Sequence, residues 1–449
     1  MPYILNTEKE IAEMLNSIGA SGFDEFYSSL DSKIILSRPL GIPKGLSEFE
    51  TKKELSKLSD KTRAIDEFNS FLGSGCYDHY IPAAVSALAS SHQFVTAYTP
   101  YQPECSQGIL QAIYEYQSYI CRLTGMDVSN ASVFDGASSL AEAALMALRL
   151  SAKRKVLVCG AIHPEYIETL RTYFSGFDFV IEEMEHGKDG LVDLDRLSSK
   201  MNGEIGCSIV QSPNFFGLIE NIKEFASKVK PHGALVVSVV NPLSLAILKE
   251  PGSLGVDIVC GDGQSLGCEI SFGGPSFGFL AAKKEYLRQM PGKIVGKTTD
   301  IEGCPAYCLT LQTREQHIRR EKATSNICSN QSHQAIRAAI YLSLLGKEGL
   351  TKAARYSLNN TQYLYQNLKS IDGVSIPYGP GVFNEFLWEV DRPKALLDEL
   401  FKKKIIAGYF AGDILPNHRG AVISCCTEKK TKNDIDAFIS AVKDILKHR

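Results

Sequence analysis

The feature that most constrains the fold is an alternation of short β-branched runs with helical segments between Gly125 and Met290. A strand, a helix and a second strand in this order form a βαβ unit, whose two strands lie parallel in one sheet. The chain therefore predicts an α/β fold with a mainly parallel sheet. The expected strands are 155–160, 177–184, 206–213, 234–240 and 256–261, with helices at 138–152 and 163–176 and a strand followed by a helix in 277–290.

The two ends of the chain follow other patterns. The segment Thr7–Glu10, "TEKE", forms a capping box, and apolar residues then recur at helical spacing. Proline and glycine punctuate the sequence up to about Ile65, which indicates an extended arm. A long helical stretch and shorter alternating elements follow Gln331. We expect an N-terminal helix and arm at 1–65, a large α/β domain at 66–330 and a small C-terminal α+β domain at 331–449.

Charge and hydropathy exclude two classes of partner. The chain has 449 residues with 48 Lys and Arg against 51 Asp and Glu, a net charge of −3, and no basic run suited to nucleic acid. The longest apolar stretch, 234–248, is broken by Asn241-Pro242 and is too short to cross a bilayer. The N-terminus lacks the cations and apolar core of a signal peptide. We expect a cytoplasmic protein that binds neither nucleic acid nor membrane.

The chain has 12 cysteines but no CxxC pair. The nearest groupings, Cys304 with Cys308 and Cys425 with Cys426, have no histidines at zinc-site spacing. We therefore expect reduced, mostly buried cysteines and no metal site.

A glycine-rich turn, "GDGQSLG" at Gly261–Gly267, follows an apolar run and invites comparison with a dinucleotide loop. That motif requires a third glycine where this chain has Leu266, and a helix directly after the turn. The next residues break instead at Gly273, Gly274 and Pro275. A dinucleotide site is therefore not expected.

Five segments carry a resemblance to a known family: Tyr77–Val85, Val95–Gln117, Thr124–Ala147, Gly261–Gly267 and Thr310–Cys328. They resemble the P-protein family of the glycine cleavage system, and in particular the alpha chains of organisms that divide this protein between two chains. The resemblance implies the fold type I architecture of pyridoxal phosphate (PLP) enzymes, which is the aspartate aminotransferase-like fold. This implied fold agrees with the βαβ pattern.

In such enzymes a lysine forms a Schiff base with PLP, an aspartate pairs with the pyridinium nitrogen and a histidine stacks on the ring. The resemblance places the lysine position on Gln264, or on Ser265 if the gap is placed differently, and the aspartate position on Ser238. Only the stacking position is retained, as His163 in "GAIHPEY", although a partly buried histidine with a satisfied hydrogen bond explains this residue equally simply. The chain is therefore expected to have no catalytic residue and to bind no cofactor of its own.

The resemblance also implies a role for the complex. A beta subunit carries PLP and decarboxylates glycine, and the aminomethyl group passes to the lipoyl group of H-protein, with two alpha and two beta chains expected. In this fold the active site lies at a subunit interface, so the proline-bounded loop "TAYTPYQPE" is expected to reach the partner's pocket, although it suits an aromatic interface anchor as well. The candidate residues are Tyr98, Thr99, Tyr101, Gln102 and Glu104.

Two further motifs have simpler interpretations. The segment Phe134–Ala143 looks like a phosphate cup, but we expect Ser138 or Ser139 to serve only as a helix cap. The segment Arg314–Asn326 interleaves cations with glutamates, and we expect a solvated or interchain ion-pair surface.

Two alternative functions remain open. One is a self-sufficient PLP enzyme that uses Lys283 or Lys284. No lysine occurs between Lys249 and Lys283, so these two are the first lysines after the glycine-rich turn. The other is a purely structural scaffold that contributes no residue to any active site.

Overall fold

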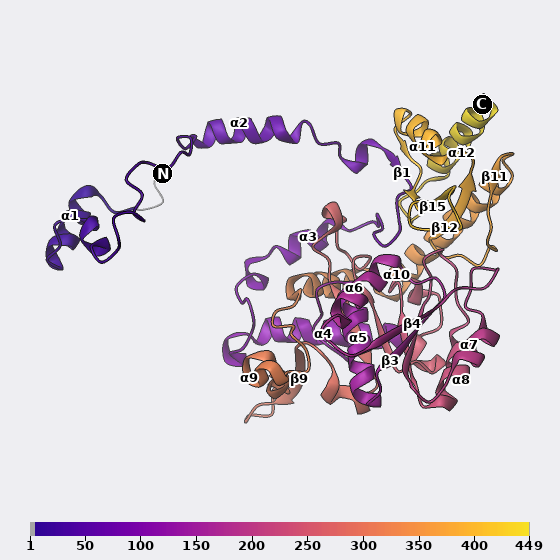
Figure 1. Cartoon of the computed structure of the whole chain (residues 1–449), viewed down its shortest axis with the longest axis horizontal. Coiled ribbons are helices and arrows are strands. Elements are labelled where there is room, and N and C mark those ends of the chain that lie inside the picture. Colours follow the sequence, from indigo (N-terminus) through magenta and orange to yellow (C-terminus); the bar gives the residue numbers. More distant parts are fainter. Residues whose placement is uncertain (1–4, 449) are drawn as a thin grey trace. The chain divides into compact units, whose positions relative to one another are not determined.

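A computed structural model describes residues 5–448, and the chain divides into two units, Met1–Arg63 and Ala64–Arg449 (Figure 1). In the first unit the Thr7 hydroxyl accepts a hydrogen bond from the Glu10 N–H, which confirms the predicted capping box. A second capping box, Ser47 with Glu50, begins a helix that the sequence analysis missed. Among the described residues of this unit only Ala20 is buried. Its helices are α1 (Glu8–Ser17), η1 (Phe23–Tyr27) and α2 (Glu48–Ser59).

The second unit is built on a seven-stranded sheet with the order β2-β8-β7-β6-β5-β3-β4. The five strands β7, β6, β5, β3 and β4 run parallel, and β8 and β2 complete the sheet in antiparallel pairs. The predicted α/β class with a mainly parallel sheet is therefore confirmed. The strands are β2 (Val128–Ser129), β3 (Lys155–Cys159), β4 (Val180–Met184), β5 (Ile205–Gln211), β6 (Leu235–Val239), β7 (Ile258–Asp262) and β8 (Gly278–Ala282).

Alternate residues of these strands enter two separate cores, because successive side chains of a strand point to opposite faces. On β3, Val156 and Val158 pack with α5 and α6, whereas Leu157 and Cys159 pack with the helices of the other face. Helices therefore cover both faces of the sheet, as a parallel sheet requires. The helices of the sheet domain are α3 (Ala83–Ala89), α4 (Gln107–Thr124), α5 (Gly136–Ser151), α6 (Pro164–Phe174), α7 (Leu194–Lys200), α8 (Ile222–Val229) and α9 (Gln316–Arg319).

A smaller antiparallel sheet with the order β11-β12-β15-β14 forms the C-terminal part of the second unit, drawn in orange and yellow in Figure 1. The long helix α10 (Ser332–Lys369) joins the two parts: Ala335 and Ala338 pack in the main core, and Leu364 packs with Trp388 in the C-terminal core. The predicted boundary at 330 stays a prediction. The remaining elements are β1 (Asn69–Ser70), β9 (Ile294–Thr299), β10 (Pro305–Thr310), β11 (Val374–Ser375), β12 (Glu385–Val390), α11 (Pro393–Lys402), β13 (Ile405–Ile406), β14 (Tyr409–Phe410), β15 (Ala421–Cys425) and α12 (Lys432–Lys447).

The structure corrects two smaller expectations. The helix expected within 277–290 is the 3-10 helix η9 (Lys284–Gln289). All twelve cysteines are free, but only half of them are buried, and Cys105, Cys304 and Cys328 are exposed. Within residues 5–448, no group of three or more potential ligand side chains could hold a metal ion, and no helix has the length and apolarity needed to cross a bilayer.

Candidate functional site

A small cavity, here called the strand-end cavity, lies at the carboxyl ends of the parallel strands. Gln211 at the end of β5, Val239 at the end of β6 and Asp262 at the end of β7 contribute to its lining. Open α/β sheets bind ligands at this edge. The cavity encloses about 40 Å³, whereas a small-molecule pocket measures about 300–1,000 Å³.

Gln264, at the predicted lysine position, is buried beside this cavity and makes three side-chain hydrogen bonds. Its Oε1 accepts the Tyr77 N–H at 2.9 Å, and its Nε2 donates to the carbonyls of Tyr77 at 3.0 Å and Cys268 at 2.8 Å. The amide therefore fixes two chain segments that lie 187 residues apart. A lysine ammonium has no acceptor and could not receive the Tyr77 N–H.

The side chain of Asp262, at the end of β7, contacts the N-terminus of α5, which belongs to the segment that resembles a phosphate cup. Its Oδ2 accepts the Gly136 N–H at 2.9 Å, and its Oδ1 accepts the Gln264 N–H at 2.8 Å and the Ser276 hydroxyl at 2.5 Å. Burial raises the pKa of this carboxyl, and the three hydrogen bonds oppose that rise. A helix N-terminus attracts anions, and here a carboxylate of the chain itself satisfies it.

The cap of α5 differs from the prediction. Asp135 is the N-cap, and its Oδ1 accepts the Ser138 N–H at 2.7 Å. Ser138 completes the capping box from the third helical position, and Ser139 donates to the Phe279 carbonyl at 2.5 Å. An aspartate is a strong N-cap because a full negative charge faces the helix N-terminus.

His163 lines the strand-end cavity and is held on both ring nitrogens. Its Nδ1 accepts the Glu165 N–H at 3.2 Å, so the Nε2 must carry the proton that it donates to the Ser74 carbonyl at 3.1 Å. The ring stacks on Tyr166, with centroids 5.2 Å apart, and meets Phe215 edge-on at 4.9 Å. Burial lowers the pKa of His163, which agrees with a neutral imidazole.

Glu385 reaches the same cavity from the C-terminal part and is only 4% exposed. Its Oε1 accepts the Tyr77 hydroxyl at 2.6 Å, and its Oε2 accepts the Ser74 N–H at 2.7 Å. Burial raises the pKa of Glu385 to about 7. The cavity thus contains one buried carboxyl group, Glu385, and one half-buried, Asp262, and no Lys or Arg is among its lining residues.

Ser238 and Ser265, the remaining predicted positions, are both buried. The Ser238 hydroxyl in β6 has no hydrogen-bond partner within the described chain, and the Ser265 hydroxyl lies 3.4 Å from the Asn241 Oδ1. A serine hydroxyl cannot hold a pyridinium proton by charge. Together with the small volume, the absent lysine and the two carboxyls, these residues do not fit PLP.

The loop with Tyr98 and Tyr101 does not line the strand-end cavity. Tyr98 is 85% exposed and Tyr101 is 42% exposed. The Tyr101 ring meets His317 edge-on at 5.6 Å and lies 5.7 Å from the Lys293 ammonium. Thr99 accepts the Tyr101 N–H through its carbonyl, and Gln102 and Glu104 lie at the 3-10 turn η4 (Pro103–Cys105).

The charged segment Arg314–Asn326 is exposed from Gln316 to Lys322, as expected, and only its first residues are internal. Arg314 donates to the backbone carbonyls of Leu311, Met290 and Gly292, and Glu315 is 8% exposed. The interleaved charges Arg319, Arg320, Glu321 and Lys322 lie in the solvent.

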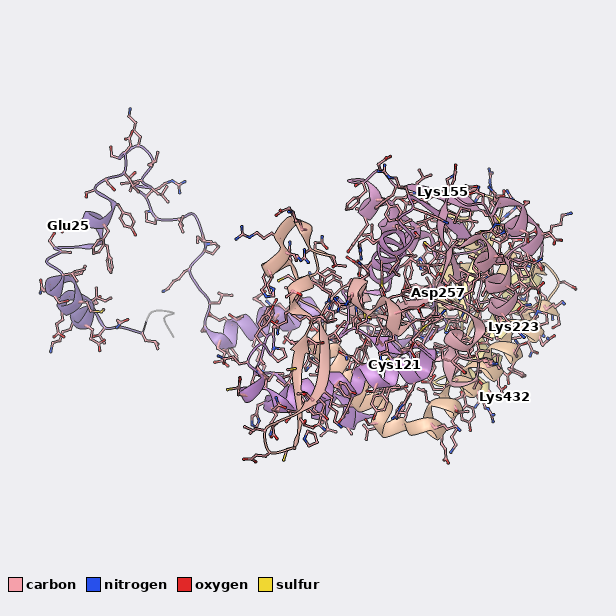
Figure 2. All side chains as sticks on the ribbon, turned by 90° about the horizontal axis from the view of Figure 1, so that it is seen from below. Glu25, Cys121, Lys155, Lys223, Asp257 and Lys432 are labelled. Atoms are coloured by element: carbon pink, nitrogen blue, oxygen red, sulfur yellow. The ribbon has the colours of Figure 1, made fainter. Side chains whose placement is uncertain are left out.

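Lys283 and Lys284 also lie away from the strand-end cavity lining. The Lys283 ammonium pairs at 2.6 Å with Asp257, labelled in Figure 2, and Lys230 pairs with the same carboxylate at 3.1 Å. The Lys284 backbone donates to Asp127. The geometry disfavours Lys283 as an activated nucleophile because an adjacent carboxylate keeps it protonated, raising its pKa.

Sequence reasoning missed most of the polar groups around the cavity. Tyr77, Tyr166 and Glu385 come from segments far apart in the chain, and no spacing links them. Asp262 lies within the glycine-rich turn Gly261–Gly267. An aspartate in a turn often accepts a backbone N–H two residues further on, so the sequence did contain a signal for this residue.

Comparisons with known proteins agree with this geometry. Residues 1–442 match the family described as "Glycine cleavage system P-protein". A chain of Desulforamulus reducens named probable glycine dehydrogenase (decarboxylating) subunit 1 is 46% identical over 437 residues, covering 97% of this chain and 98% of that one. A chain of Carboxydothermus hydrogenoformans with the same name is 44% identical over 442 residues, covering 98% and 99%.

Solved structures give the same result. A crystal structure of glycine decarboxylase (P-protein) of the glycine cleavage system, in inhibitor-bound form, has a TM-score of 0.91 and 39% identity, and the match covers 99% of this chain and 100% of that one. A sphingosine-1-phosphate lyase of Burkholderia pseudomallei, at 12% identity and a TM-score of 0.68 over 94% of each chain, shows likeness of fold alone.

The two-core sheet and its strand-end cavity place the chain among proteins with the architecture of fold type I PLP enzymes. More narrowly, it belongs to the glycine cleavage system P-protein family, as a subunit 1 chain of glycine dehydrogenase (decarboxylating). The resemblance and the fold class predicted from the sequence are confirmed.

Proposed function

We propose that this chain is the non-PLP alpha subunit of glycine decarboxylase and that it completes the active site of a PLP-bearing beta subunit. Glycine loses its carboxyl group as carbon dioxide in that site. The aminomethyl group then bonds to one sulfur of the lipoyl disulfide of H-protein, the S–S bond breaks and the other sulfur becomes a thiol. The proposed assembly contains two alpha and two beta chains in the cytoplasm.

The observation that carries this proposal is the hydrogen-bonded Gln264 beside a cavity of about 40 Å³. Two carboxyl groups, the half-buried Asp262 and the buried Glu385, line the cavity, and no lining residue is a Lys or Arg that could pair with a phosphate ester. These features support a subunit that binds no PLP of its own, in which the residues at the family's cofactor position stabilise the fold instead.

Mixing the purified chain with PLP tests the first half of the proposal. We expect no visible absorbance from a lysine adduct and no cofactor retained after borohydride reduction. A stoichiometric adduct on one lysine would instead favour the self-sufficient enzyme. The beta subunit, treated in parallel, is the positive control.

The exposed loop carries the second half of the proposal. Monomeric proteins seldom leave neighbouring aromatics as exposed as Tyr98 and Tyr101 unless a partner covers them. In the reconstituted complex, Tyr101→Phe removes only a hydroxyl and keeps the ring that packs on His317. We expect glycine–bicarbonate exchange to fall about tenfold, since one lost hydrogen bond to a charged group is worth about 1.5–3 kcal/mol.

Tyr356→Phe on α10 removes an exposed hydroxyl elsewhere in the same unit and is the matched control. A scaffold without active-site residues would keep full exchange in the assembled Tyr101→Phe and Tyr98→Phe complexes. Gel filtration of each complex separates lost assembly from lost turnover.

A further inference from the structure

A second cavity, here called the helix cavity, lies between α5, the end of α6 and the segment 316–326. It encloses about 640 Å³, which is within the range of about 300–1,000 Å³ for small-molecule sites. The strand-end cavity and the loop with Tyr98 contribute none of its lining.

A buried carboxylate lines the helix cavity. Glu142 on α5 is 1% exposed, and its Oε1 accepts the Ser325 hydroxyl at 2.7 Å. Its Oε2 is buried without any hydrogen-bond partner in the described chain. A buried carboxylate oxygen without a partner is costly, so this atom is suited to a donor from outside the chain.

A buried guanidinium nitrogen lies two turns further along the same helix. Arg149 donates from Nη2 to the Gln289 carbonyl at 3.3 Å, but its buried Nε–H has no partner within the described residues. Residues seven apart share one helix face. Glu142 and Arg149 thus offer one unused acceptor and one unused donor to a single cavity, and no ion pair within 4.0 Å joins them in the described chain.

Aromatic rings form one side of the wall, and polar residues of the segment 316–326, such as Arg320 and Glu321, form another. Tyr173, Phe177 and Phe179 line the cavity from the end of α6 and the following turn. The rings of Phe177 and Phe179 stack with their centroids 5.2 Å apart. A small number of placed polar groups on an aromatic wall is the usual composition of a ligand site.

We propose that the helix cavity binds a zwitterionic α-amino acid with an apolar side chain. The ligand's ammonium group donates to the Glu142 Oε2, its carboxylate accepts from the Arg149 Nε, and its side chain packs on the aromatic wall. Both orphaned groups are then satisfied by one molecule whose two charges lie a few ångströms apart. Glycine lacks the apolar body and binds more weakly at this site.

Calorimetric titration of the full-length chain tests the proposal with three small molecules that share a phenyl ring but differ in their charged groups. L-Phenylalanine carries both charges, 3-phenylpropionate lacks the ammonium group and phenethylamine lacks the carboxylate. We expect saturable 1:1 binding of L-phenylalanine and at least tenfold weaker binding of the other two. Equal binding of all three, or binding of none, would overturn the proposal.

Two variants locate the binding. Glu142→Gln replaces the acceptor by an amide and is expected to weaken L-phenylalanine at least tenfold, whereas Glu115→Gln, an exposed glutamate on α4, leaves it unchanged. Ala323→Trp fills the cavity without touching either charged group and is expected to abolish binding, which keeps the test decisive if Glu142→Gln misfolds. Unchanged binding in a folded Ala323→Trp chain would place the ligand elsewhere.

Discussion

The strand-end cavity and the helix cavity differ in volume and in how their charged side chains are satisfied. At the strand-end cavity Gln264, Asp262 and Glu385 each hydrogen-bond to other parts of the chain, and about 40 Å³ remains. At the helix cavity Glu142 and Arg149 each keep an unused polar atom, and about 640 Å³ remains.

This difference separates core from ligand site on physical grounds. Polar groups that satisfy one another stabilise the fold and leave nothing for a ligand to complete. Polar groups that lack partners cost stability in the free protein, and a cost of this kind is typical of functional positions. The strand-end cavity has the location of a cofactor site, but its Gln264 and its two carboxyl groups are bonded as in a core, and Asn241 Nδ2 is its lining group without a partner in the described chain.

Gln264→Ala gives the largest expected effect on this comparison. The substitution leaves the Tyr77 N–H and the carbonyls of Tyr77 and Cys268 without their partner. Buried groups left unpaired cost about 1–3 kcal/mol each, so we expect the free energy of unfolding to fall by about 3 kcal/mol or more. Urea unfolding followed by circular dichroism measures it.

Gln111→Ala is the matched control, because this exposed glutamine on α4 makes one side-chain hydrogen bond, to Glu115. Its expected cost is below about 0.5 kcal/mol. A Gln264→Ala chain as stable as the control would mean that the strand-end cavity is not structural core.

Glu385→Gln gives the next largest effect, in the dependence of stability on pH. The pKa of Glu385 is raised from 4.5 to about 7 by burial, so the folded chain binds more protons than the unfolded chain between these values. The free energy of unfolding therefore falls as pH rises through this window. The glutamine removes this fall, which is worth up to about 3 kcal/mol at about 1.4 kcal/mol per pKa unit.

The amide can keep both hydrogen bonds of Glu385, since its oxygen accepts the Ser74 N–H and its NH₂ donates to Tyr77 once that hydroxyl turns around. Unfolding free energies at pH 5 and pH 8 should therefore agree more closely in the variant than in the native chain. Burial also raises the pKa of Glu220 to about 7. Glu220 therefore adds the same pH dependence of stability to the native chain and to the variant. An unchanged pH dependence in Glu385→Gln would show that Glu385 is ionised at little cost.

Local sequence patterns predicted the elements that form the sheet and its connecting helices. The short β-branched runs of β3 and β5 to β7 and the helical periods of α5, α6 and α10 depend on neighbours in the sequence, and each was found. The helix α2 was missed because the proline and glycine before it outweighed its capping box, Ser47 with Glu50.

The site was less predictable, for a physical reason. The resemblance placed Gln264 and His163, and both line one cavity. The partner of Gln264 is backbone 187 residues away, and Glu385 arrives from another sheet. The helix cavity is defined by unsatisfied atoms, Glu142 Oε2 and Arg149 Nε, which only coordinates reveal.

Glu142→Gln gives the smallest expected effect on stability and the opposite sign. Burial raises the pKa of Glu142, although the Ser325 hydrogen bond and the charge of Arg149 oppose the rise, so the carboxylate charge carries a net cost in the ligand-free chain. A glutamine oxygen still accepts the Ser325 hydroxyl, and the neutral amide avoids the cost of a buried charge. We expect the free energy of unfolding at pH 8 to rise by about 1 kcal/mol, while L-phenylalanine no longer stabilises the chain. Thermal unfolding with and without L-phenylalanine measures both effects, with Glu115→Gln as the control. A destabilised Glu142→Gln chain would show that Glu142 belongs to the satisfied core, as Gln264 does, and the contrast between the two cavities would fail.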